Sequence, residues 1–223
     1  MKSKSIELSD YKAQEAGTRA IRHAIASCVG QEIPIYFPHP HRLWEYGGAM
    51  QAYLETFGSF RGGLQALDIG CGNSPLGPAL ELTTDTTVTE IDPDIRLLAK
   101  RKGTARRSFE VGDLLALDGR GPYDAVFCIS VIEHIEEQVE AWNSLIQLVK
   151  PGGLLFVTTD FGEDHTKPWY ADTERVAKYD PKRVANMGEW LTERGFTLDL
   201  DPTFYGPQVF DYTFFRWVAH ATK

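Results

Sequence analysis

The sequence has few cysteines, no long apolar run and no excess of basic residues. Its 223 residues include only Cys28, Cys71 and Cys128, too few for the disulfide framework of a small secreted domain. No apolar run reaches the roughly 20 residues that cross a bilayer, and residues 1–5 lead into no apolar core of signal-peptide length. These absences predict a cytoplasmic protein without a membrane partner.

Acidic residues outnumber basic ones, 31 against 23, which gives a net charge of −8. This balance disfavours a nucleic-acid partner, because binding to a phosphate backbone usually needs a basic face. We interpret the one basic run as a solvated helix end and loop; it contains Lys100, Arg101, Lys102, Arg106 and Arg107. The length is sufficient for one sizeable α/β domain with its own core.

The most informative stretch is Leu67-Asp68-Ile69-Gly70-Cys71-Gly72-Asn73. Its apolar residues predict the end of a buried strand, and Gly70 and Gly72 predict a sharp turn at which a ligand can approach the backbone. A helix is expected to follow over residues 76–82. A strand, a glycine turn and a helix start together are typical of a nucleotide cradle.

A second predicted strand ends in an acid. Residues 86–91 favour a strand, and Asp92 follows it, 20 residues beyond Gly72. An acid at about this spacing in a βαβ unit binds ribose hydroxyls. Because Asp-Pro often starts a helix, Asp92 before Pro93 also fits a helix N-cap, and the two roles are compatible.

From residue 64 onward, predicted strands alternate with predicted helices, which indicates a parallel sheet with helices on both faces. Further strands are expected at 65–69, 108–111, 125–129 and 154–159, and further helices at 93–101, 135–150 and 181–194. The helix at 135–150 has an expected buried stripe that comprises Val139, Trp142, Leu145, Ile146 and Val149.

These landmarks together resemble the class I S-adenosylmethionine-dependent methyltransferases over about residues 64–160. Leu67–Gly72 resembles their motif I, and Asp92 matches the acid that ends strand two. Three later segments match as well: Gly112-Asp113-Leu114 after strand three, residues 124–134 at strand four and residues 150–153 before strand five. The resemblance implies a Rossmann-like, seven-stranded, mostly parallel sheet whose final antiparallel hairpin is formed by residues 196–200 and 211–219.

The resemblance implies S-adenosylmethionine as methyl donor and S-adenosylhomocysteine as product. Asp68 would bond the amine of the donor, directly or through water. Asp113 would accept from the adenine amino group, or would instead stabilise the turn after Gly112. The residues expected to hold the donor are Asp68, Gly70, Cys71, Gly72, Asn73, Asp92, Pro93, Asp113, Leu114, Ser130 and Val131. Cys71 and Cys128 are expected to be small packing residues rather than nucleophiles.

Residues 1–60 form a predicted helical segment before the domain at 61–223. Helices are expected over part of 9–26 and over 41–57, separated by a proline-rich extended path. In related methyltransferases such a segment often caps the cofactor cleft, which leaves two interpretations open, a cap with an acceptor pocket or a helix packed in the core. The residues of interest here are Tyr36, His39, His41, Trp44 and Tyr46.

A catalytic base is needed only if the acceptor must lose a proton. The candidates are Glu133, His134, Asp160 and His165, which follow strands four and five at the carboxyl edge where open α/β folds bind ligands. His134 is the preferred base because a histidine can take a proton near neutral pH. Asp160 or His165 would orient His134 or replace it. Alternatively, Glu133 and His134 are polar residues of a helical first turn.

No metal is expected. The Glu133-His134 pair resembles metal-assisted RNA 3′-end methyltransferases, but those carry a further glutamate at the position of Ser130. The expected function is therefore methyl transfer to an oxygen or nitrogen of a small molecule. The aromatic N-terminal segment and the pair Trp169-Tyr170 suggest a cyclic or sugar-like acceptor, because aromatic faces stack on both kinds of ring. The alternatives are an RNA or protein acceptor, or a non-catalytic module that binds S-adenosylmethionine.

Overall fold

The computed structural model describes residues 15–28, 40–58, 62–99, 101–117, 119–161, 179–199, 204–205 and 213–222. Several residues singled out in the sequence lie outside the described residues: Tyr36, His39, His165, Trp169 and Tyr170. Across the described residues, no helix combines the length and apolar character that a membrane span requires.

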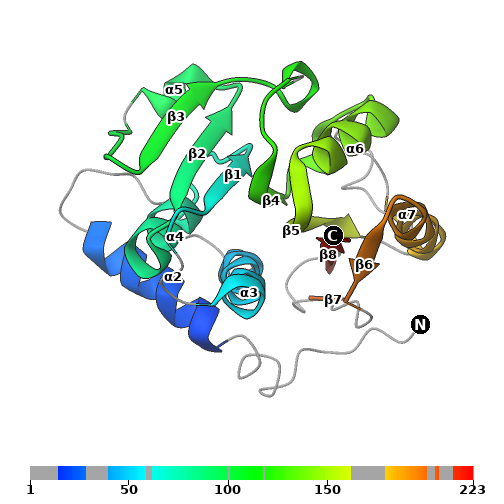
Figure 1. Cartoon of the computed structure of the whole chain (residues 1–223), viewed down its shortest axis with the longest axis horizontal. Helices are drawn as coiled ribbons and strands as arrows, with labels where there is room; N and C mark the ends of the chain where they lie inside the picture. The colour runs from blue at the N-terminus through cyan, green and yellow to red at the C-terminus, as the bar shows by residue number, and fades with distance from the viewer. Residues whose placement is uncertain are drawn as a thin grey trace.

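Two helices precede an alternation of strands and helices (Figure 1). The first elements are α2 (Glu15–Cys28), α3 (Pro40–Phe57), β1 (Gln65–Ile69), α4 (Leu76–Thr84), β2 (Thr87–Asp92), α5 (Ile95–Leu98), β3 (Arg107–Val111) and the 3-10 helix η1 (Leu114–Ala116). The later elements are β4 (Tyr123–Ile129), the 3-10 helix η2 (Ile132–His134), α6 (Gln138–Gln147), β5 (Val149–Phe161), α7 (Pro181–Glu193), β6 (Phe196–Leu198), β7 (Phe204–Tyr205) and β8 (Thr213–Ala221).

The strands form one sheet in the order β3-β2-β1-β4-β5-β8-β6, and the two-residue β7 pairs with β8 beside this path. The first five are parallel, whereas β8 runs antiparallel to both β5 and β6. Ile69 pairs with Ile91 and with Cys128, so β1, β2 and β4 end at the same edge. The predicted Rossmann-like sheet with an antiparallel end is confirmed, and this carboxyl edge is where such folds bind ligands.

Local signals in the sequence explain where α3 and α7 end or begin. Gly58 has a φ of +76°, a value that favours glycine, and its N–H closes α3 by donating to the Leu54 carbonyl. The Asp180 side chain accepts from the Arg183 N–H at 2.7 Å and caps α7, whose first residue is Pro181. Both helices therefore lie close to their predicted positions.

Two predicted helices are shorter than expected. The helix predicted at 93–101 is the single turn of α5, which starts after Asp94 because the Asp94 side chain caps it by accepting from the Arg96 N–H. The helix predicted at 135–150 is α6, and Val149 already belongs to β5. Val139 is 67% exposed, so its place in the buried stripe was wrong. The helical period does not explain this exposure, because Val139 lies three residues before Trp142 and residues at that spacing share a helix face; Val139 is the second residue of α6, in its first turn.

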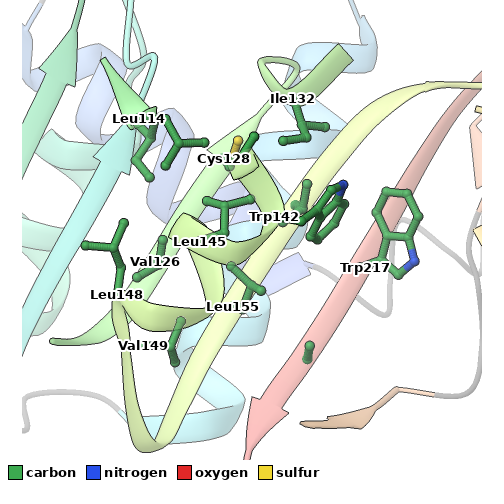
Figure 2. Packing of buried hydrophobic residues seen from close by; sticks show 14 of the residues in the cluster. Leu114, Val126, Cys128, Ile132, Trp142, Leu145, Leu148, Val149, Leu155 and Trp217 are labelled. Carbon is green, nitrogen blue, oxygen red and sulfur yellow. The ribbon is translucent and has the colours of Figure 1, made fainter. Parts of the chain in front are cut away.

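The sheet separates two hydrophobic clusters. On one face, α6 packs Trp142 and Leu145 against Val126 of β4 and Leu155 of β5, with Trp217 of β8 nearby (Figure 2). The Trp142 and Trp217 rings meet edge to face, with centroids 5.3 Å apart. On the other face, α2, α3 and α4 share a cluster with the sheet; it includes Ile21, Ala24, Met50, Tyr53, Leu76, Leu80, Phe127 and Phe156.

Candidate active site

The turn after β1 brings two strand ends close together. Gly70 has a φ of +63°, and a Cβ added there would lie 2.3 Å from a methyl carbon of Val131, which follows β4. Any side chain at this position would therefore clash. Gly72 also has a positive φ, +44°, and a Cβ there would have no atom closer than 4.0 Å. The backbone at Gly72 thus remains open to a ligand.

Asp92 holds this turn in place from the end of β2. Its Oδ2 accepts from the Gly72 N–H at 2.8 Å, and its Oδ1 accepts from the Asp94 N–H at 2.8 Å. Because a carboxylate offers about four acceptor positions, two remain for the hydroxyls of a ribose. Asp92 is not the helix N-cap proposed as its second role, since Asp94 caps α5. Pro93 lies exposed between them.

Two buried acceptors beside the turn lack a partner. Among the described residues, neither Asp68 Oδ2 nor Asn73 Oδ1 receives a hydrogen bond. Burial, and next the nearby Glu90 carboxylate, raise the pKa of Asp68 to about 8. A ligand amine would supply both the missing donor and a compensating charge. These orphaned oxygens fit the charged amine of S-adenosylmethionine, and the open Gly72 backbone fits the close approach of its nucleoside.

The predicted adenine contact occupies a helix cap. Asp113 Oδ1 accepts from the Leu115 N–H at 2.9 Å and caps η1, as the turn-stabilising alternative expected. Asp113 is exposed while Leu114 is buried, so the second carboxylate oxygen of Asp113 remains accessible. Its contact with adenine stays a prediction.

The two cysteines of the motifs are buried and unpaired. Burial raises the pKa of both the Cys71 and Cys128 thiols. Neither is a thiolate at neutral pH, which agrees with their expected role as packing residues.

Glu133, which follows β4, and Asp160, which is the last residue but one of β5, lie close enough to influence each other. Glu133 is 0% exposed, and within the described part of the chain neither of its oxygens has a hydrogen-bond partner. Burial, then the charge of Asp160, raise the pKa of Glu133 well above its usual range. Burial, then the charge of Glu45, raise the pKa of Asp160 to about 6. Asp160 is thus a stronger base than an ordinary aspartate.

His134 is placed differently from its neighbour Glu133. The residue is exposed, and burial of part of its ring, then the Arg42 charge, lower its pKa. The imidazole is therefore neutral at pH 7 and able to accept a proton. The fourth candidate, His165, lies outside the described residues.

Sequence reasoning missed two site residues on α3. Glu45 Oε1 accepts from the Ser130 Oγ and the Thr158 Oγ1, each at 2.6 Å, and Arg42 donates to Glu45 Oε2 at 3.0 Å. The available signal was the charge of Glu45 between Trp44 and Tyr46, inside a predicted helix with many apolar residues. Its contacts could not be anticipated, because they join positions 85 and 113 residues apart.

Two aromatic residues of the amino-terminal segment, Trp44 and Tyr46, lie in different surroundings on α3. Trp44 is fully buried, as a core residue would be, with the Arg216 guanidinium of β8 5.3 Å from its ring centroid. Tyr46 hydrogen-bonds to Ser74 beside Asp68, and burial raises the Tyr46 pKa. Helix α3 therefore packs on the sheet and also reaches the cradle.

The basic run, which the sequence predicted to be a solvated helix end and loop, is solvated only in part: Lys102 and Arg106 are exposed, but two of its arginines are not. Arg101 and Arg107 are buried; Arg101 Nη1 donates to Glu90 Oε1 at 2.7 Å, and Arg107 Nε lies 3.4 Å from Glu90 Oε2. Arg101 Nη2 also donates to the Ser74 carbonyl at 2.9 Å. The reason is Glu90, a fully buried acid on β2 that requires compensating cations.

A metal-binding arrangement is not evident in the part of the chain that the structure describes. Among those residues, no group of three or more His, Cys, Asp and Glu side chains could hold a metal ion. Ser130 stands at the position where the metal-assisted pattern has a glutamate, and its hydroxyl instead bonds Glu45.

Comparisons with known proteins agree with this geometry. A family described as "Methyltransferase domain" matches residues 67–155. The ubiquinone biosynthesis O-methyltransferase of Xanthomonas axonopodis pv. citri is 28% identical, over 87% of both chains. That of Xylella fastidiosa (strain 9a5c) is 32% identical, over 61% of this chain and 62% of its own. For several of these relatives, the matched part covers less than two thirds of the relative's own length.

A solved structure supports the same fold. Phosphoethanolamine N-methyltransferase 2 of Haemonchus contortus, in complex with S-adenosyl-L-methionine, superposes with a TM-score of 0.63 at 16% identity. The match covers 79% of this chain and 53% of that one. Together with the cradle at Gly70, Gly72 and Asp92, these comparisons support a class I methyltransferase that uses S-adenosylmethionine as methyl donor.

Proposed function

We propose that this enzyme methylates a hydroxyl oxygen of a small-molecule acceptor and that Asp160 takes the hydroxyl proton. The observation that carries this proposal is the acid pair Glu133 and Asp160 at the carboxyl edge, beside the donor cradle. An oxygen acceptor is supported by relatives named as O-methyltransferases. A small acceptor is supported by the net charge of −8, which opposes an RNA backbone.

Each polar group would have a defined task in this reaction. The donor supplies a methyl group on a sulfonium centre, so the protein mainly aligns the reactants and excludes water. Asp92 would bind the ribose hydroxyls and Asp68 the amine. At pH 7 Asp160 is largely ionised and can accept a proton, whereas the raised pKa of Glu133 favours its neutral form. His134 is the second candidate for the base.

The ring-shaped acceptor remains a prediction with less support. Trp44 is in the core, and Trp169 and Tyr170 lie outside the described residues. A methyl acceptor screen should therefore include both hydroxylated rings and open-chain alcohols. A cytoplasmic location and the division at residue 60 also stay predictions.

Donor binding tests the first half of the proposal. We expect calorimetric titration with S-adenosylhomocysteine to show binding that Asp92→Ala weakens on the order of one hundredfold, because hydrogen bonds to a charged group are lost. Asp94→Ala is the matched control, since Asp94 faces Arg96 rather than the cradle. Binding to the wild type that Asp92→Ala leaves unchanged would contradict the assigned cradle.

Methyl transfer tests the second half. With S-adenosylmethionine labelled on its methyl group, we expect label to appear in a hydroxyl-bearing small molecule. Label transferred instead to bulk RNA or to protein would replace the proposal with one of its alternatives. Tight donor binding without any labelled product would favour a non-catalytic binding module.

The raised pKa of Asp68 leads to a prediction of how donor binding depends on pH. Pairing with the ligand amine favours ionised Asp68, so its pKa of about 8 must fall in the complex and a proton is released. Affinity for S-adenosylhomocysteine should therefore rise as pH increases from 6 to 8, by up to about tenfold per unit. Calorimetry in two buffers of different ionisation enthalpy measures the released proton.

The control for this prediction removes only the titrating group. Asp68→Asn should bind more weakly and release no proton, whereas the exposed Asp199→Asn should behave like the wild type. If Asp68→Asn keeps the wild-type proton release, another group is responsible for it.

A further inference from the structure

Glu45 is a fully buried acid held by three donors from different parts of the fold. It belongs to α3, is 0% exposed, and receives hydrogen bonds from Arg42 on its own helix, from Ser130 after β4 and from Thr158 on β5. Burying a carboxylate is costly unless it is paired and hydrogen-bonded. This position lies outside the matched methyltransferase segment 67–155.

The two hydroxyl donors are themselves linked. The Ser130 N–H donates to Thr158 Oγ1 at 3.1 Å, so Ser130, Thr158 and Glu45 form a closed triangle. Ser130 has a φ of +51°, a backbone conformation that residues other than glycine rarely adopt. The hydrogen bonds of this triangle can maintain it. Glu133 follows Ser130 by three residues, and Asp160 follows Thr158 by two. The triangle therefore involves the backbone segments that carry both acids.

We propose that Glu45 is a positioning residue of the methyl-transfer site, which fastens α3 to the ends of β4 and β5 and supplies the negative charge that acts on Asp160. This inference rests on the proposed function, in which Asp160 is the base. The acid comes from the amino-terminal helix rather than from the sheet, so α3 both covers the site and adjusts its chemistry.

The electrostatic environment is consistent with this role. After burial, Glu45 is the main cause that raises the pKa of Asp160, whereas Arg42 lowers it. Arg42 and Glu45 lie three residues apart on α3 and form an ion pair. Because one is positively and the other negatively charged, they shift the pKa of Asp160 in opposite directions. Among the described residues, the other charged or titratable groups around this cluster include Tyr46 on α3, Asp68 on β1, Cys128 on β4, Glu133 and His134 on η2, Tyr179, and Arg216 on β8.

If Glu45 and Arg42 had only a structural role, replacing them would not shift the pKa of Asp160 in opposite directions. We therefore expect Glu45→Gln to lower the Asp160 titration midpoint by about one pH unit and Arg42→Gln to raise it. Protein labelled with ¹³C at the aspartate carboxyl reports the midpoint by NMR, and the signal missing from Asp160→Asn identifies the residue. Glu55→Gln, at an exposed acid of the same helix, should leave the midpoint unchanged.

The outcomes separate this inference from the proposed function. The titration needs neither donor nor acceptor, so it remains decisive if no methyl transfer is found. An Asp160 midpoint that does not move in Glu45→Gln, or that moves the same way in Glu45→Gln and Arg42→Gln, overturns the inference. Should Glu45→Gln fail to fold, the upward shift in the half-exposed Arg42→Gln still decides whether α3 sets the charge state of Asp160.

Discussion

Replacing Arg101 with leucine is expected to lower the free energy of unfolding by about 3–5 kcal/mol, because it removes the closest cation from the buried Glu90. Glu90 cannot move away, since α4 lies directly over it: a Cβ at Gly77 would be 2.5 Å from the Glu90 carboxyl carbon. Chemical denaturation at neutral pH measures the loss. Because Arg101 also holds the Ser74 carbonyl, donor binding should weaken as well.

Two further variants make this expectation specific. Arg96→Leu is the matched control, since Arg96 is exposed and its pair with Asp94 lies on the surface, where such pairs contribute at most about 1 kcal/mol. The double variant Glu90→Gln with Arg101→Leu should recover part of the stability, because no uncompensated buried charge remains. An Arg101→Leu loss no larger than that of Arg96→Leu would refute the structural role of the buried pair.

Replacing Asp160 with asparagine is expected to lower kcat by about 10²–10⁴-fold, the usual contribution of a general base. The affinity for S-adenosylhomocysteine should stay within about threefold, since the cradle residues are untouched. The wild-type rate should fall as pH drops through about 6, because Asp160 must be ionised to accept a proton and its pKa is near that value. Steady-state kinetics on an acceptor from the screen provide both measurements.

The comparison with His134→Asn decides between the two candidate bases. His134 is exposed and Asp160 half-buried, so both side chains can be replaced with little loss of stability. Glu140→Gln on the exposed side of α6 controls for a general effect of removing an acid. A variant Asp160→Asn that keeps its rate, together with a His134→Asn that loses it, would assign the proton transfer to His134.

The sheet was predictable because its signals are local. The run of β1 and the glycines after it lie within eight residues, and the acid of β2 follows at a spacing that the βαβ unit fixes. The predicted first strand coincides with β1, and the Asp180-Pro181 pair marked the start of α7. These features depend on neighbours in the chain, so one sequence contains them.

The electrostatic part of the site was not predictable in the same way. Glu45 meets Ser130 and Thr158 across 85 and 113 residues, and Arg101 was assigned to solvent because nothing near it in the sequence marks Glu90, on β2, as its buried partner. Charge alone does not tell a buried acid from an exposed one; only the packing of α3 and α4 over the sheet does. The predicted burial of Val139 was wrong for a related reason, since an apolar residue of a helix can also be exposed.

The shared cluster of α2 and α3 with the sheet limits how the chain can be divided in the laboratory. A fragment that starts at residue 61 would leave Leu76, Leu80, Phe127 and Phe156 without the helices that cover them. An uncovered apolar face of several hundred Å² promotes self-association. It would also leave the hydroxyls of Ser130 and Thr158 without their acceptor. Exchange of amino-terminal segments between relatives should therefore transfer α3 together with its contact residues on β4 and β5.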